Sequence, residues 1–354
     1  MSKKVIVVLF GGQSPQHEVS KISAAAAINV MDTDKYYIMP VYITHDGKWM
    51  MYDGPVENIA NRQWEKYATR VILSPDAQHK GLLRIVGDRI KNISVDLVFP
   101  LLHGGIGGDG AAAGLLEMAR LPYIGSDMFA SNAAGNKIYM KKLAKRLKIK
   151  TADYITFSDI DKNKLDSICA KIEKTFGYPV VVKPSRGGSS IGVNKAENKE
   201  ELKKALEEAD MCDSDIVVER AVKCREFECG ILGKSNVIVS QIGEIKTEDA
   251  IYSFDAKYNN SKTEIIVPAD IEDEKMNKMH DIAVKMFREL GCKGPARADF
   301  LINEETGDVL FNGLNTMPQF NSNRSYIMLW EASGIEFDKL IEEIIDMELE
   351  STGE

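Results

Sequence analysis

An uninterrupted apolar run near the N-terminus, residues 5–10 with the sequence VIVVLF, is the feature that most constrains the fold. A strand without polar alternation is typical of a parallel sheet that is covered on both faces. Residues 37–43 and 95–102 have similar patterns, and helix-like stretches follow the first and the third of these strands. This alternation over roughly the first 120 residues predicts an open α/β domain.

The helix expected after the first strand indicates where the core should lie. Ser14 is suited to cap its N-terminus, and Val19, Ile22, Ala26 and Val30 fall on roughly one face at helical spacing. From about residue 136 the pattern changes to α+β, with a basic helix, two further helices and short strands around a Gly/Ser loop. The last part of the chain holds several strands, a long helix and a closing helix.

Charge and cysteine usage argue against several classes of function. The net charge of −8 argues against nucleic acid or an anionic membrane as the main partner. The five cysteines are scattered and form no CxxC pair, so neither a disulfide scaffold nor a structural zinc site is expected. The first apolar run is too short for a signal peptide or a membrane span. We therefore expect a cytosolic protein.

The segment VVVKPSRGGSSIGV, residues 180–193, is the strongest candidate for anion binding. A buried strand would present Lys183 at its end, and Arg186, two glycines, Ser189 and Ser190 would follow as a flexible loop. Glycines let backbone N–H groups approach an anion, while the hydroxyls and the lysine add donors and positive charge. This composition suits a polyphosphate; a plain hairpin loop with a snorkelling lysine is the alternative.

A second candidate site lies in the segments CKGPARADFLIN and DVLFNGLNTMPQF. Arg297 and Asp299 alternate on one expected strand, so their side chains should share a face. Asn315 lies on the next strand-like segment. Oxygen ligands from Asp and Asn suit Mg²⁺, and the arginine suits a phosphate or an oxyanion. The alternative is an ion pair on a solvated face.

Four weaker candidates lie elsewhere in the chain. Glu18 is near a helix N-terminus, where a carboxylate suits either a ligand ammonium or simple capping of the dipole. His103, between a strand end and a Gly-rich turn, is either a site residue or structural. Lys257 and Tyr258 could meet a phosphate and donate a hydrogen bond, or belong to an amphipathic surface loop. The GxGxxG at residues 105–110 matches a dinucleotide motif but follows a late strand, which argues against that function.

Taken together and in this order, the segments resemble the D-alanine–D-alanine ligases of the ATP-grasp superfamily over nearly the whole chain. The resemblance rests on FGGQSPQHEVS, VFPLLHG, LPYIGS, PVVVKPSRGGSSIGV, DAKY, CKGPARADF, NTMP and LWEASGI. It implies an α/β ATP-grasp fold that follows an N-terminal open α/β domain. The expected domains are residues 1–122, 123–212 and 213–354, arranged around a central cleft.

The resemblance also implies a role for individual residues at an ATP site between two sheets. It assigns residues to the nucleotide and the loops that close over it: Lys137 and Lys183 to the phosphates, Glu219, Val222 and Glu226 to adenine and ribose, Ser189 and Ser190 to one closing loop, and Lys257 and Tyr258 to the other. Ser189 and Tyr258 are expected to act in catalysis together with Glu18 and Arg297.

For the amino-acid substrates and the metal, the resemblance implies three further sets of residues. Glu18 would hold the ammonium group of the first D-alanine, and Arg297 would stabilise the tetrahedral oxyanion. Asp299 and Asn315 would bind Mg²⁺, for which Mn²⁺ could substitute. His103, Ser322 and Arg324 are the remaining residues expected at the substrate pocket.

Several positions depart from the family pattern. Gly313 stands where the family has a Glu that bridges two Mg²⁺ ions, so one metal site should be weak. Gly108 replaces a second acid. Residues 321–324 read NSNR in place of a TSHS-like stretch that meets the carboxylate of the second substrate, and Arg324 is suited to that carboxylate.

The resemblance implies an ATP-dependent ligase that joins two D-alanines for peptidoglycan precursor synthesis. The first carboxylate would attack the γ-phosphate to give an acyl phosphate, and the amine of the second D-alanine would displace phosphate. Two alternatives stay open: a catalytically impaired nucleotide-binding paralogue, and a ligase that takes D-serine or D-lactate second. A nicotinamide dehydrogenase built on residues 105–110 is the rival enzyme. A homodimer is expected from the resemblance alone.

Overall fold

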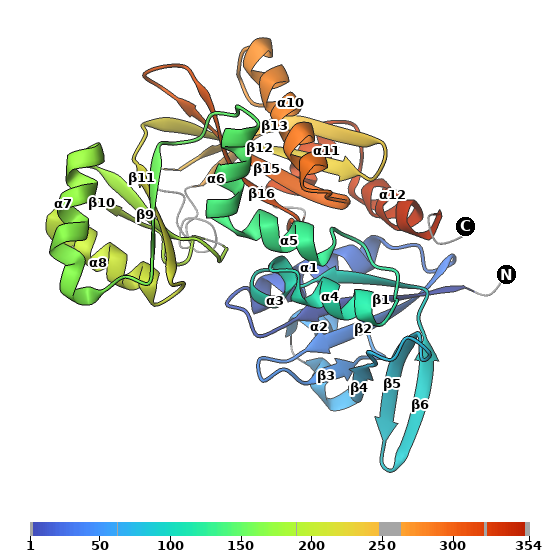
Figure 1. The fold of residues 1–354 in the computed structure, drawn as a ribbon. Helices are drawn as coiled ribbons and strands as arrows, with labels where there is room; N and C mark the ends of the chain where they lie inside the picture. The colour runs from blue at the N-terminus through green and yellow to red at the C-terminus, as the bar shows by residue number, and fades with distance from the viewer. Residues whose placement is uncertain (1–2, 62, 189, 248–262, 322–323, 351–354) are drawn as a thin grey trace.

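The computed structural model describes residues 3–61, 63–188, 190–247, 263–321 and 324–350. These residues form three sheets that follow one another along the chain, with helices packed on their faces (Figure 1). Within these ranges, no helix is long and apolar enough to cross a membrane.

The first sheet contains the apolar run. Its strands are β1 (Lys4–Gly11), β2 (Tyr36–Ile43), β3 (Trp49–Met51), β4 (Thr69–Leu73), β5 (Gly81–Val86), β6 (Arg89–Ser94) and β7 (Leu97–Leu101). Strand β1 lies between β2 and β7 and is parallel to both, while β3 to β6 extend the sheet from β2 as an antiparallel meander. The predicted open α/β domain is confirmed, with a mixed sheet.

Both faces of β1 are buried, which accounts for its lack of polar alternation. The helices of this domain are α1 (His17–Val30), α2 (Glu57–Asn61), α3 (Gly105–Gly108) and α4 (Ala111–Met118), with a short 3-10 helix at Gln63–Tyr67. Ile6, Val8 and Phe10 pack in one core with α1, and Val7 and Leu9 pack in another with α4. Each successive side chain of the strand therefore has a core to enter.

The predicted apolar face of α1 is wrong. Ile22 is exposed and the other three predicted residues are only partly buried, whereas the buried face includes Ser20, Lys21 and Ser23. Ser14 does not cap the helix either, because Gln16 is its N-cap residue; the Ser14 hydroxyl accepts from the Gln16 backbone N–H at 3.0 Å. The polar side chains inside have specific partners: the Ser20 hydroxyl donates to the Leu101 carbonyl at 2.5 Å and accepts from a backbone N–H of β1.

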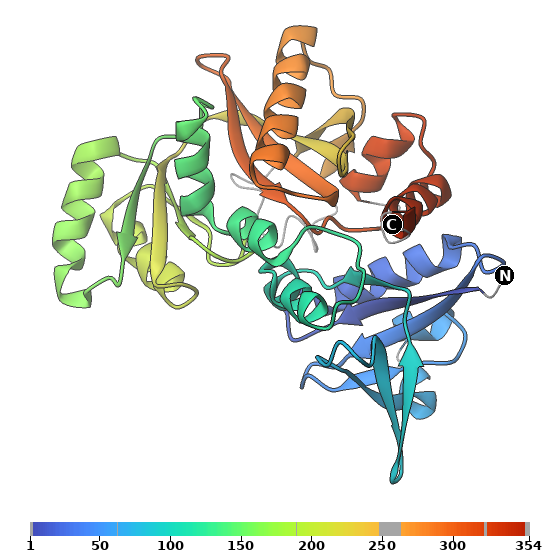
Figure 2. The same cartoon turned by 45° about the vertical axis from the view of Figure 1, so that its right-hand side comes forward.

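The second sheet is antiparallel, in the order β10-β9-β11-β8. Its strands and covering helices are β8 (Tyr154–Ser158), α7 (Leu165–Phe176), β9 (Val180–Pro184), β10 (Asn194–Ala196), α8 (Lys199–Asp210) and β11 (Asp215–Arg220), with a 3-10 turn at Lys162–Lys164. Both helices pack on one face of the sheet. In Figures 1 and 2 this unit lies at the left, away from the first sheet.

The third sheet is antiparallel in the order β14-β13-β12-β15-β16. Its strands are β12 (Cys224–Gly233), β13 (Val237–Lys246), β14 (Glu264–Ile266), β15 (Gly294–Asn303) and β16 (Val309–Asn315). One core joins this sheet to α5 (Met128–Gly135), α6 (Lys137–Arg146) and α10 (Asp273–Glu289). Two helices that precede the second sheet in sequence thus pack on the third. The domain limits at 122 and 212 stay predictions.

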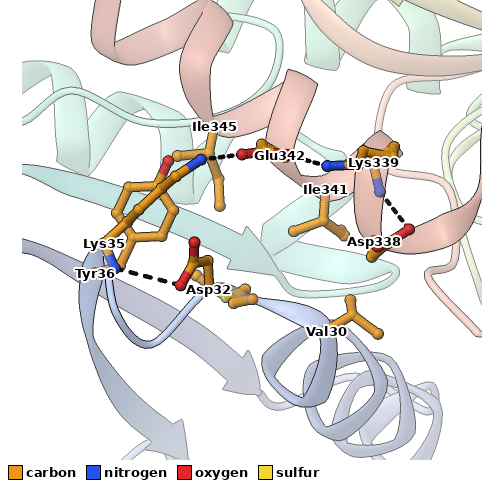
Figure 3. A pocket seen from close by; sticks show the side chains of 10 residues that line it. Val30, Asp32, Lys35, Tyr36, Asp338, Lys339, Ile341, Glu342 and Ile345 are labelled. Atoms are coloured by element: carbon orange, nitrogen blue, oxygen red, sulfur yellow. Dashed lines mark hydrogen bonds and ion pairs between the residues drawn. The ribbon is translucent and has the colours of Figure 1, made fainter.

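The C-terminal helices connect the last domain to the first. Helices α11 (Ser325–Glu331) and α12 (Phe337–Glu350) share a core with α1 and β1. Figure 3 shows the contact between α12 and the turn before β2, where Lys35 pairs with Glu342 beside a cavity of about 270 Å³. The Tyr36 hydroxyl donates to Asp346 at 2.9 Å. These contacts fix the last helix of the chain against the N-terminal domain.

Candidate functional site

The first cluster at the candidate site consists of two lysines that share one buried carboxylate. Lys183 lies at the end of β9, and its Nζ is 2.7 Å from Oε2 of Glu219 on the neighbouring strand β11. Nζ of Lys141, from α6, is 2.8 Å from Oε1 of the same carboxylate. The exposed fractions of the three side chains are 14% for Lys183, 6% for Lys141 and 5% for Glu219. Lys183 is therefore the most exposed of the three.

Charge compensation decides the ionisation of this cluster. Burial alone would raise the pKa of Glu219, but the ammonium groups of Lys183 and Lys141 lower it to about 2. Burial lowers the pKa of Lys141, against the attraction of Glu219. The Glu219 carboxylate was expected at adenine or ribose, yet both of its oxygens are engaged by lysines. Lys141 was not among the sequence candidates.

The Gly/Ser loop after β9 is anchored from two sides. The Arg186 guanidinium binds Asp213, with contacts of 2.7 and 3.1 Å, so this arginine is held by protein carboxylates. Lys137, the first residue of α6, donates from Nζ to the Gly187 carbonyl at 3.1 Å. Ser190 adopts a positive φ of 60°. Lys137, Lys183 and this loop thus lie together, whereas Ser189 is outside the described residues.

Val222 and Glu226 lie at the junction of the second and third sheets. Val222 belongs to the three residues that connect β11 to β12, and Glu226 is on the first part of β12, opposite Leu301 of β15. Both residues are half-buried. The assignment of both residues to adenine and ribose, which the resemblance implies, stays a prediction.

The second cluster lies on one face of the third sheet. Arg297 is opposite Asn315, and Asp299 is opposite Gly313 on β16 and Glu228 on β12. Because directly opposed residues share a face, these positions converge. Nε and Nη2 of Arg297 are 2.7 and 3.0 Å from the two oxygens of Asp299, and Nη2 is 3.2 Å from Oε1 of Glu228.

The oxygen donors of this cluster fit one Mg²⁺ ion. Mg²⁺ is usually held by one or two protein ligands together with phosphate oxygens and water. Asp299 keeps 28% of its side chain exposed, and Asn315 accepts a backbone N–H from Met317 through Oδ1, which leaves that oxygen a second lone pair. At the third position, Gly313 supplies no oxygen. Position 313, where the resemblance implies a bridging Glu, therefore adds no ligand to this cluster.

The two N-terminal candidates differ in their surroundings. Oε2 of Glu18 is 2.5 Å from Nζ of the buried Lys21, and 53% of the Glu18 side chain is exposed. His103 is buried, its Nε2 is 2.8 Å from the Ser23 hydroxyl, and burial lowers its pKa to about 4. His103 is therefore neutral near pH 7 and bonded to α1.

Gln16 is a residue that the sequence reasoning missed. Its side chain is buried at the start of α1, next to the Gly-rich turn that follows His103. A Cβ on Gly104, which has a φ of 65°, would lie 2.8 Å from Oε1 of Gln16. Two loops from different strands of the first sheet therefore meet at Gln16. The spacing of polar residues in GGQSPQHEVS carries no signal that would have selected it over Glu18.

The other candidates are placed only in part. Arg324 is half-buried and precedes α11, with its backbone N–H bonded to the Asn321 carbonyl at 2.9 Å. Ser322, Lys257 and Tyr258 lie outside the described residues. The first four residues of the GxGxxG form α3, and Gly110 is the N-cap residue of α4. A Cβ on Gly107 would lie 1.6 Å from the carbonyl oxygen of Leu102, the residue after β7, so close backbone packing explains that glycine.

Comparison with known proteins identifies the family of this chain. A family model described as D-ala D-ala ligase N-terminus matches residues 5–126, and one described as D-ala D-ala ligase C-terminus matches residues 143–346. The chain belongs to the D-alanine–D-alanine ligase family. A D-alanine–D-alanine ligase of Acetivibrio thermocellus is 40% identical over 98% of this chain and 96% of the relative, and one of Clostridium novyi is 38% identical over 98% of both.

Solved structures of this family confirm the ATP-grasp fold. The VanG D-Ala:D-Ser ligase of Enterococcus faecalis superposes with a TM-score of 0.88 and 34% identity, covering 98% of this chain and 99% of that one. The D-alanine–D-alanine ligase of Coxiella burnetii gives a TM-score of 0.83 and 29% identity, covering 99% and 96%.

The two glycines that depart from the family pattern both have space around them. For Gly313 and for Gly108, no described atom lies within 4 Å of the Cβ that a side chain would carry, and neither residue has a positive φ. The backbone at these positions would accept an acid. The departures therefore remove charge without a steric reason in the described structure.

Proposed function

We propose that this protein is an ATP-dependent ligase that joins two D-alanines through an acyl phosphate, for peptidoglycan precursor synthesis. The observation that carries the proposal is the pairing of two charged clusters on consecutive sheets of one ATP-grasp fold. One cluster, with Lys183, suits a polyphosphate. The other, with Arg297, suits a developing oxyanion. A carboxylate–amine ligase needs both functions, because it transfers a phosphoryl group and then forms a tetrahedral centre.

Different residues of the chain serve the nucleotide, the metal ion and the tetrahedral centre. Lys183 and Lys137 bind and orient the phosphates, and the junction at Val222 and Glu226 receives the nucleoside. Arg297 faces the amino-acid end, where its guanidinium stabilises negative charge on the oxygen of the tetrahedral centre. Asp299 and Asn315 would hold Mg²⁺, which supplies positive charge to the phosphoryl oxygens when bound. The cleft between the sheets limits hydrolysis of the acyl phosphate.

A second candidate function is a nucleotide-binding paralogue with impaired catalysis. It is favoured by Gly313, which leaves Asp299 as the one carboxylate among the expected Mg²⁺ ligands, and by the ion pairs of Arg297 with Asp299 and Glu228. The second substrate is also open within the ligase proposal. A structural relative is a D-Ala:D-Ser ligase, and the second-substrate stretch here contains Arg324.

The deciding experiment measures ADP release with Mg²⁺, with and without D-alanine, and then with D-serine or D-lactate added as the second substrate. Turnover that depends on D-alanine supports the ligase. ATP binding without such turnover supports the paralogue, and absence of ATP binding contradicts both. NADH binding is measured in parallel to test the dehydrogenase rival. The homodimer and the cytosolic location stay predictions that this assay does not address.

Substitution of Lys183 tests the nucleotide site itself. Lys183→Met leaves Glu219 paired with Lys141, so the fold should persist while ATP affinity falls roughly tenfold or more. Lys195→Met is the matched control, because Lys195 lies on the adjacent strand β10 and pairs only with exposed Glu197 among the described contacts. Calorimetric titration with ATP provides the measurement. Equal affinities in the wild type and Lys183→Met would remove this lysine from the phosphate site.

A further inference from the structure

Hydrophobic packing does not account for the position of Lys141. It projects from α6, which packs on the third sheet, but its ammonium reaches Glu219 on the second sheet. The same ammonium lies 4.9 Å from the ring centre of Tyr154 and donates to the Ala152 carbonyl at 3.3 Å. A long cationic side chain is costly to bury unless it is paired and hydrogen-bonded. These contacts meet that requirement.

The charges of the cluster do not cancel. Lys141 and Lys183 are two cations and Glu219 is one anion, so the buried group carries a net charge of +1. Each lysine holds a different oxygen of the carboxylate. With Lys141 present, Glu219 neutralises Lys183 only in part. Without it, the carboxylate and Lys183 would form a neutral pair.

The net positive charge of the cluster can act on a ligand through Lys183. Lys141 is almost enclosed, with 6% of its side chain exposed, while Lys183 is more open at 14% and stands at the start of the Gly/Ser loop. A polyphosphate that enters the cleft would meet Lys183 first. The contribution of Lys141 is therefore transmitted through Glu219 and not by contact with the ligand.

We propose that Lys141 is a positioning residue of the nucleotide site: it holds one oxygen of Glu219 and so leaves the positive charge of Lys183 available to the phosphates. This inference rests on the proposed function, because it assumes that ATP binds beside Lys183. It predicts that loss of Lys141 lowers the affinity for ligands that carry phosphates and not the affinity for other ligands of the cleft. A residue that only pinned α6 to the second sheet would affect all ligands of the cleft alike.

The test compares ligands with and without phosphates on the full-length protein. ATP and adenosine are titrated calorimetrically into the wild type, Lys141→Met, Lys141→Gln and Lys141→Arg. We expect the Met and Gln variants to bind ATP roughly tenfold more weakly and adenosine with unchanged affinity, while the Arg variant keeps most of the ATP affinity. Lys142→Met, on the exposed side of α6, is the control and should match the wild type.

The outcomes separate this inference from the proposed function. Unchanged ATP affinity in the Met and Gln variants, or an equal loss for ATP and adenosine, would overturn the positioning role. The Gln variant covers the case in which Lys141→Met does not fold, because its amide can still donate to Glu219. If the wild type itself fails to bind ATP, the proposed function fails.

Discussion

Introducing a carboxylate at position 313 is the most direct test of whether the missing acid limits this active site. Gly313 lies opposite Asp299 on the neighbouring strand, and no described atom lies within 4 Å of the Cβ that a side chain here would carry. In the Gly313→Glu variant the new side chain would enter open space beside Asp299, with the two Cβ atoms about 5 Å apart. The substitution adds a metal ligand without displacing a neighbour.

The size of the effect follows from Coulomb attraction. Two unit charges about 4 Å apart interact by about 1 kcal/mol in water and about 4 kcal/mol near a protein surface. Asp299 is only 28% exposed, so the upper end of this range applies better than the value for bulk water. Repulsion between the two carboxylates in the metal-free protein offsets part of the gain. We expect a net gain of about 1.4 kcal/mol, which is about tenfold tighter Mg²⁺ binding.

Calorimetric titration of Mg²⁺ in the presence of ADP measures this gain, and D-alanine-dependent ADP release measures its consequence. The Gly313→Glu variant should bind Mg²⁺ more tightly and turn over faster than the wild type. Gly313→Gln is the matched control, with nearly the same shape and no charge. A gain of equal size in the Gln variant, or no gain in the Glu variant, would refute the argument from the missing charge.

Two further predictions concern stability. Because burial lowers the pKa of His103 to about 4, its unfolded form binds more protons between pH 6.5 and 4, and stability is lost as pH falls through this range. The free energy of unfolding in urea should fall by about 2 kcal/mol more from pH 7 to pH 5 in the wild type than in His103→Gln; equal slopes would contradict this. Gly104→Ala should lower stability by about 2 kcal/mol, because the φ of 65° is strained for alanine and its Cβ would press on Gln16. Gly87→Ala has a φ of 57° and no described neighbour within 4 Å, so thermal melts should show a smaller loss, and equal losses would exclude the steric contribution.

The sequence predicts best where one physical requirement decides the structure. The run at residues 5–10 has to be a strand buried on both faces, and β1 has a hydrophobic core on each side. The alternation of Arg297 and Asp299 has to place both on one face, and their side chains are in contact. Hydrophobicity and strand periodicity act locally, so a single segment carries the information.

The sequence fails where a polar residue is buried for a distant partner. On α1 the apolar spacing selected Ile22, but Ser23 is inside because its hydroxyl meets His103, 80 residues away. Lys141 was overlooked for the same reason, since its value depends on Glu219 from another sheet. Nothing local to either helix reveals these contacts. Polar burial of this kind requires knowledge of the tertiary arrangement.

The distribution of charge in the cleft connects these observations to activity. The cluster around Glu219 supplies a net positive charge from α6, β9 and β11, and none of these residues lies on β16. The missing acid at Gly313 should therefore weaken metal binding more than nucleotide binding. ATP affinity and turnover can then be separated in this chain: tight ATP binding with slow turnover that recovers in Gly313→Glu would identify a ligase limited by its metal site. Slow turnover that does not recover would favour the paralogue, because the catalytic deficit would then lie elsewhere in the cleft.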